Sequence, residues 1–183
     1  MAKVIMVAMS LRKESFNKKL IVNAQSILAK EKPELITDLL LFNDYSMPVY
    51  DGDIETQHGI PDGVKNLGKK ISDADAIILS TPEYNGGIPG PFKNAIDWVS
   101  RITPMPWPGK KLLLLGASPG GLGAIRSLGH SRVPLDSIGV FVYPEMFGLA
   151  RADAAFDESG KLKDASTEER LKKILIKFAN YIG

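Results

Sequence analysis

Cysteine is absent from this chain of 183 residues. Its absence excludes disulfides, thiolate metal sites and dithiol redox chemistry together. The two histidines, His58 and His130, lie far apart and have no metal-ligand spacing with carboxylates, so we expect no metal site. If the protein transfers electrons, a bound organic cofactor has to carry them.

A surplus of charge and a long apolar run are also missing. Lys and Arg number 23 against 21 Asp and Glu, and no basic run stands out, so we expect no nucleic-acid partner. The N-terminus has no basic leader followed by an apolar segment and a cleavage site, and no stretch approaches membrane-spanning length. We therefore expect a cytoplasmic protein without a membrane partner.

The chain does contain enough apolar residues, 44% of the total, for the core of one domain spanning residues 1–183. Short apolar runs predict strands at Val4–Met9, Leu35–Phe42, Ala76–Ser80, Lys111–Ala117 and Gly139–Tyr143. Helical patterns follow at Phe16–Lys30, Pro61–Ser72, Phe92–Val99, Leu122–Val133 and at the C-terminus, where Ser166 and Glu169 offer a capping box. Near-continuously apolar strands between helices predict an α/β three-layer sandwich, with a five-stranded parallel sheet covered on both faces.

The carboxyl ends of parallel strands are where such folds bind ligands, so the loops after the first, third and fourth strands are the candidate site. The first loop, Ser10–Asn17, is rich in hydroxyl and amide groups, contains Arg12 and opens directly onto a helix N-terminus. This arrangement favours a phosphate group. Helix capping by Ser15 or Asn17, with a solvated Arg12, explains the same residues about equally well.

The second loop, Thr81–Pro91, combines Tyr84 and Asn85 with paired glycines. A tyrosine offers a flat apolar surface with a polar tip, and glycines let the backbone approach a ligand closely. These residues suit a planar ring edged with heteroatoms better than a plain turn. The third loop, Gly116–Gly123, is rich in glycine, which a tight turn explains as well as a ligand does. The polar connection Asn43–Gly63 is long enough to suggest a functional loop.

Taken together, three segments closely resemble the NADPH-dependent FMN reductase family, whose members include quinone, azo-dye and chromate reductases. The segments are SLRKESFNKKL, TPEYNGGIPGPFKNAIDWVSR and SPGGLGA, each following a predicted strand. The second is the most specific. The resemblance runs from the first strand to about Arg126 and implies a flavodoxin-like fold, bound FMN, and NADPH or NADH as the hydride donor.

The resemblance also implies roles for individual residues. The FMN phosphate would be held by Ser10, Arg12, Ser15, Phe16 and Asn17, and the isoalloxazine ring would be flanked by Pro82, Glu83, Tyr84, Asn85 and Gly86, with Ser118 and Gly121 closing the third side. Two positions depart from the family pattern. Met9 stands where glycine is usual before the loop serine, which could narrow the phosphate loop, and Ala124 stands where a second glycine is common.

The activity implied is an NAD(P)H oxidoreductase that passes two electrons to a quinone, an azo compound, chromate or free flavin by a ping-pong mechanism. The flavin carries the chemistry, so we assign no catalytic proton-transfer residue. A homodimer or homotetramer is implied as well. Two alternatives stay open: an electron carrier of the flavodoxin type, which the near-neutral charge disfavours, and a regulatory relative that has lost FMN.

Overall fold

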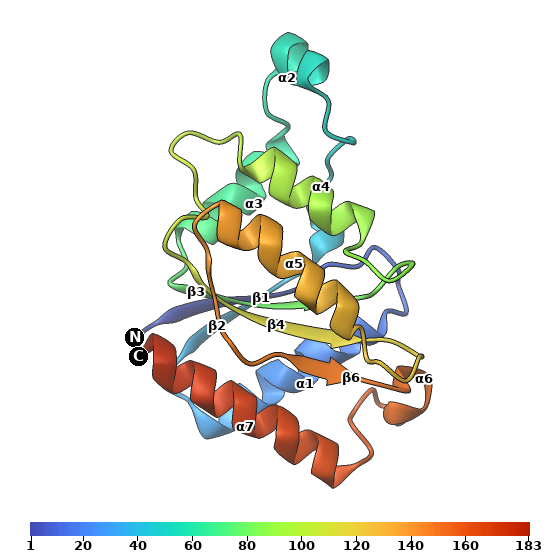
Figure 1. Cartoon of the computed structure of the whole chain (residues 1–183). Helices are drawn as coiled ribbons and strands as arrows, with labels where there is room; N and C mark the ends of the chain where they lie inside the picture. Colours follow the sequence, from blue (N-terminus) through green and yellow to red (C-terminus); the bar gives the residue numbers. More distant parts are fainter.

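The computed structural model describes residues 1–183, and Figure 1 shows a central sheet with helices on both faces. The strands are β1 (Lys3–Ala8), β2 (Ile36–Leu40), β3 (Ala76–Thr81), β4 (Lys111–Ala117), β5 (Phe141–Val142) and β6 (Phe147–Leu149). All pairings are parallel and the order is β2-β1-β3-β4-β5, with β6 also paired to β4. This order confirms the predicted doubly wound sandwich and places a switch point between β1 and β3.

The core lies in two layers because side chains alternate along each strand. Val4 and Met6 of β1 face α1 (Phe16–Glu31) and α7 (Ala165–Ile182), whereas Ile5 and Val7 face the opposite layer. That layer consists of α3 (Asp62–Ser72), α4 (Gly90–Val99) and α5 (Ile125–Ser137). No helix of the chain is both long enough and apolar enough to cross a membrane.

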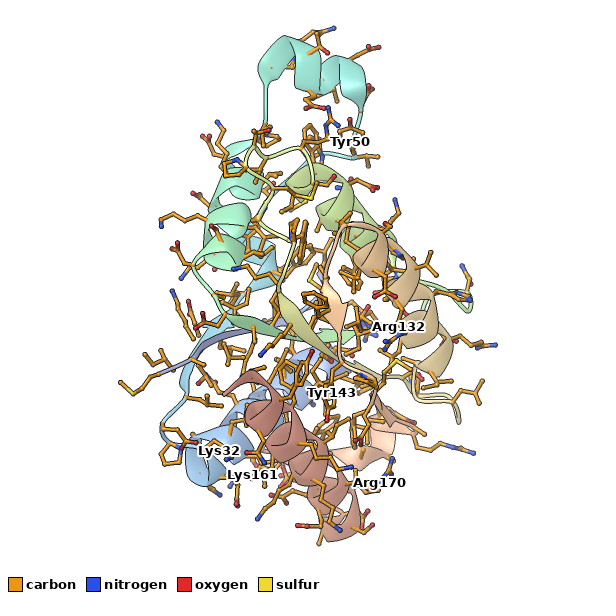
Figure 2. The ribbon with its side chains drawn as sticks, turned by 60° about the vertical axis from the view of Figure 1, so that its left-hand side comes forward. Lys32, Tyr50, Arg132, Tyr143, Lys161 and Arg170 are labelled. Carbon is orange, nitrogen blue, oxygen red and sulfur yellow. The ribbon has the colours of Figure 1, made fainter.

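The predicted fifth strand is divided. Between β5 and β6 the chain leaves the sheet at residues 143–146, where Pro144 cannot donate a ladder hydrogen bond. Arg132 of α5 instead donates to the carbonyl oxygens of Tyr143 and Val142, at 2.9 and 3.1 Å. Figure 2 labels Arg132 and Tyr143 at this break. The chain then forms the short helix α6 (Ala152–Ala155) before α7.

The connection predicted at Asn43–Gly63 contains a 3-10 turn, η1 (Phe42–Asp44), and a further helix, α2 (Gly52–His58). Figure 1 shows α2 projecting from the body of the molecule, and none of its residues is buried. It is tied back by Glu55, which binds Arg101 and the hydroxyl of Tyr50, the residue labelled at its base in Figure 2. A helix that buries no side chain needs no apolar stripe. Apolar residues therefore do not recur at helical spacing in α2, and the sequence did not predict it.

Two predicted helix starts are wrong. The N-cap of α7 is Asp164, whose carboxylate accepts from the backbone N–H groups of Ser166 and Thr167, so Ser166 and Glu169 do not form the expected capping box. Hydrogen bonds from the hydroxyls of Ser166 and Thr167 lower the pKa of Asp164 to about 2. Helix α5 begins at Ile125 rather than Leu122, because Ala124 before it has a left-handed φ of 66°.

Candidate functional site

The carboxyl ends of β1, β3 and β4 bring the three loops together around two cavities that share Glu83, Ser118 and Pro119. The smaller, of about 60 Å³, is lined by Ser10, Arg12, Ser15, Phe16, Asn17, Pro82, Glu83, Tyr84 and Ser118, with Ala117 and Pro119. The larger, of about 410 Å³, is lined by Glu83, Asn85, Gly86, Ser118 and Gly121, with Pro119, Gly120, Leu122 and Arg126. Every residue assigned to the site from the sequence therefore lines one of these cavities.

The first loop presents unused hydrogen-bond donors. The backbone N–H groups of residues 11–15 donate to no protein acceptor, and the guanidinium of Arg12 has no hydrogen-bond or ionic partner in the protein. Ser15 is the N-cap of α1, and its hydroxyl accepts from the backbone N–H of Asn17 at 3.2 Å. Free N–H groups, a helix N-terminus and an arginine together make a site for an anion.

The side chain of Asn17 belongs to the scaffold beneath the site. It is 2% exposed, and its amide donates to the carbonyl oxygen of Ala117 at 3.0 Å. Its side-chain oxygen accepts from the backbone N–H of Ala117 at 2.9 Å and from the hydroxyl of Ser80 at 2.8 Å. One residue thus joins the start of α1 to the ends of β3 and β4, and fixes the first loop against the third.

Met9 does not narrow the first loop. Its side chain is 3% exposed and packs in the core layer formed with α3, α4 and α5, and it lines neither cavity. Its backbone N–H extends the pairing of β1 with β3 by donating to the carbonyl oxygen of Ser80 at 2.8 Å. The departure from the family's glycine therefore leaves the donors of residues 11–15 in place.

The second loop contains a tight turn at its tip. Tyr84 and Gly87 exchange backbone hydrogen bonds of 3.0 and 3.3 Å across Asn85 and Gly86, which have φ angles of 50° and 76°. Asn-Gly is the sequence that such a turn with two positive φ angles favours. The backbone N–H groups of Asn85 and Gly86 have no protein acceptor, and the ring of Tyr84 is 44% exposed.

The side chain of Glu83 turns toward helix α5. It accepts from Nε of Arg126 at 2.7 Å and from the backbone N–H groups of Arg126 and Ser127 at 3.1 and 3.3 Å. Burial favours the neutral acid, but these hydrogen bonds and the charge of Arg126 outweigh it and lower the pKa of Glu83. Glu83 is therefore an ionised cap of α5, a helix that has no other side-chain cap.

The third loop is packed closely against β6. A Cβ on Gly123, whose φ is 57°, would lie 2.8 Å from the backbone nitrogen of Ala150 and 2.9 Å from the carbonyl carbons of Gly148 and Leu149. Ser118 ties the loop by donating its backbone N–H to Leu149 and accepting from the backbone N–H of Ala124 at its hydroxyl. Gly123 thus has a packing role, whereas Gly121 has open space around it, as the sequence predicts.

Sequence reasoning did not find two features of this region. Arg126 lines the larger cavity from α5, and no sequence motif marks it as a site residue. An apolar cavity of about 490 Å³ lies beside the first loop, lined by Leu11, Phe42, Asn43, Tyr45, Ser46, Met47, Val49, Gly90, Pro91 and Asn94. The length of the connection Asn43–Gly63 was the sequence feature that could have indicated this cavity. The walls of the cavity suit a flat apolar group.

Comparisons with known proteins agree on one family. The family model described as NADPH-dependent FMN reductase matches residues 2–154. The quinone reductase of Escherichia coli strain K12 is 33% identical over 180 residues, which cover 94% of this chain and 91% of that protein. The NAD(P)H:quinone oxidoreductase of Solanum tuberosum is 38% identical over 176 residues, covering 91% of this chain and 86% of the relative.

Solved structures show the same relationship. FerB, a flavoenzyme NAD(P)H:(acceptor) oxidoreductase from Paracoccus denitrificans, superposes with a TM-score of 0.83 at 31% identity and covers 100% of this chain and 97% of its own. An archaeal flavodoxin, at 12% identity and a TM-score of 0.62, shares the flavodoxin-like fold. The chain belongs to the NADPH-dependent FMN reductase family.

Proposed function

We propose that this protein binds FMN across its three loops and transfers two electrons from NADPH or NADH to a quinone or a similar small acceptor, in a ping-pong reaction. Its family and its quinone reductase relatives support this activity. The observation that carries the proposal is the donor set of the first loop, where the N–H groups of residues 11–15 and the guanidinium of Arg12 have no protein partner.

The residues present fit the phosphate end of FMN. A phosphate has three strong acceptor oxygens, and the first loop supplies backbone donors, the Arg12 guanidinium and the hydroxyls of Ser10 and Ser15 at the start of α1. Phe16 and Asn17 complete this end of the cavity. No acidic side chain lines the smaller cavity except Glu83, whose charge is matched by Arg126.

The larger cavity fits a ring system with polar edges. The unpaired N–H groups of Asn85 and Gly86 and the open backbone around Gly121 offer donors to this cavity, and Tyr84, which lines the smaller cavity, offers a flat face. Glu83, Ser118 and Pro119 line both this cavity and the phosphate end, and Pro82 lines the phosphate end alone. A ligand with a phosphate at one end and a heteroaromatic ring at the other suits both parts.

Bound FMN would supply the redox chemistry, accepting electrons as a hydride and passing them on. The chain's residues bind and orient it: the first loop fixes the phosphate, and the second and third loops border the ring. No acid or base of the protein needs to move a proton. Ping-pong kinetics would follow if the hydride donor and the acceptor bound in turn at the same cavity.

We further propose that the active form is a homodimer or homotetramer and that residues 1–183 act as one domain. Three apolar side chains at and before the exposed face of α5 support a subunit contact: Leu122, Ile125 and Val133 are 56%, 40% and 73% exposed. Large exposed apolar side chains are candidates for a protein interface. The cytoplasm, where NAD(P)H is available, is the compartment we propose.

An anaerobic titration of the FMN-loaded protein with NADPH tests this function. Loss of the oxidised-flavin absorbance, restored by a quinone, is the expected result. Flavin that binds but stays oxidised would indicate an electron carrier, and failure to bind FMN would indicate a relative that has lost its cofactor; either result refutes the proposal. Free FMN mixed with NADPH at the same concentrations is the control.

A further inference from the structure

The larger cavity has two charged residues in its lining, Glu83 and Arg126, and the two side chains differ in burial. The Glu83 side chain is 8% exposed, whereas the Arg126 side chain is 57% exposed. The carboxylate receives three hydrogen bonds, from Nε of Arg126 and from the backbone N–H groups of Arg126 and Ser127. The negative charge is therefore buried and satisfied.

The guanidinium of Arg126 is held at the cavity wall and retains unused donors. Nε and Nη2 face Glu83, and Nη1 has no protein acceptor. The guanidinium carbon lies 3.7 Å from the point that a Cβ on Gly86 would occupy, so it rests against the turn of the second loop. This cavity thus presents a guanidinium that is paired with Glu83 through Nε and Nη2 and has Nη1 free.

The two arginines of the site lie in different cavities. Arg12 lines the smaller cavity with the phosphate-type donors, and Arg126 lines the larger one beside the Asn85-Gly86 turn. If FMN spans both, Arg12 faces a phosphate whose charge is the same in both redox states. Hydride transfer from NAD(P)H brings two electrons and one proton to the ring and releases NAD(P)⁺, so the bound flavin gains one negative charge. Of the two arginines, only Arg126 therefore has an electrostatic interaction with the flavin that differs between the oxidised and reduced states.

We propose that Arg126, held in place by Glu83, stabilises the reduced form of the bound flavin and so raises its reduction potential. This inference rests on the proposed function. A cation near a developing charge in a partly enclosed site stabilises the charged state selectively. Because the guanidinium is more than half exposed, we expect a modest preference, about tenfold in affinity for reduced over oxidised FMN. For a two-electron couple, tenfold corresponds to about 30 mV.

The test measures the reduction potential of the FMN-loaded protein by anaerobic equilibration with a reference dye. Arg126→Gln should lower the potential by about 30 mV, and Arg126→Lys should retain most of the wild-type value. Arg12→Gln is the matched control. It removes the same charge from the phosphate end, so it should weaken both redox forms equally and leave the potential unchanged.

A second measurement needs no variant at the site. If the reduced flavin is held as an anion, the wild-type potential should fall around neutral pH by about 30 mV per pH unit, the slope of one proton per two electrons. A slope of about 59 mV, which corresponds to two protons, overturns the inference, as does an unchanged potential in Arg126→Gln. Both results leave the reductase function standing, whereas a wild-type protein that binds no FMN overturns the function and the inference together.

Discussion

Asn17 offers the sharpest test of how the site is built, because one side chain joins three strand and helix ends. Asn17→Ala removes hydrogen bonds of 3.0 and 2.9 Å to the backbone of Ala117 and one of 2.8 Å to the hydroxyl of Ser80. All are buried. Each buried group left without a partner costs about 1–3 kcal/mol. Ala117 lines the smaller cavity, where water can replace some of these bonds.

We therefore expect Asn17→Ala to lower the free energy of unfolding by about 3–5 kcal/mol, below the simple sum of three losses. This is a large part of a typical domain stability of about 5–15 kcal/mol. The variant should also bind FMN more weakly, because the first loop loses its anchor to the third. Urea unfolding measures the stability and fluorescence titration measures the FMN affinity.

Asn23→Ala is the matched control. Asn23 also makes three hydrogen bonds, to the carbonyl oxygens of Lys19 and Gly160 and from the backbone N–H of Leu162, but it is part-buried and lines neither FMN cavity. We expect it to cost about 1–3 kcal/mol and to leave FMN affinity unchanged. A loss below about 1 kcal/mol in Asn17→Ala, or an equal loss of FMN affinity in both variants, would refute the assignment of Asn17 to the scaffold of the site.

Four further variants test other parts of the molecule. Gly123→Ala should lower the unfolding free energy by about 2–4 kcal/mol in urea, because its methyl group meets backbone atoms at a positive φ; Gly129→Ala, on open helix surface, should raise it by about 0.5–1 kcal/mol. Asp164 has a pKa of about 2, below its ordinary value of 3.8, so its contribution is present above pH 3.8 and is lost as the pH falls through 2. Asp164→Asn should keep the helix cap but flatten this acid dependence in thermal melts, and an unaltered profile would contradict the assignment. Arg12→Ala should weaken FMN binding by about 1.5–3 kcal/mol in a fluorescence titration, whereas unchanged affinity would remove Arg12 from the phosphate site.

The sequence predicted the sheet and the three loops well because these depend on local signals. Buried parallel strands such as Ala76–Thr81 are continuous apolar runs, and the special residues of the loops are contiguous. The structure then gathers all the assigned residues around two cavities. The structure also gives Asn17 a second role. Its side-chain amide hydrogen-bonds Ala117 and Ser80 and so supports the loops, besides lining the cavity.

Features that depend on distant partners were not predictable. Glu83 and Arg126 are 43 residues apart, and neither shows in its own segment that it pairs with the other. Helix α2 has no apolar stripe, and the N-cap of α7 is Asp164 rather than the predicted Ser166. The split of the last strand arises from Pro144 together with Arg132, which donates from another layer.

The split of the last strand has a consequence for pairing between chains at this edge of the sheet. The strands at this edge of the sheet have two and three residues, and Arg132 already binds the carbonyls of Val142, at the end of β5, and of Tyr143, just after it. This edge therefore offers no long row of free backbone N–H and C=O groups with which a strand of a second chain could pair. At the opposite edge, β2 carries Asp38 in an ion pair with Lys70. Short, interrupted or charged edges make a strongly apolar parallel sheet a poor template for edge-to-edge pairing.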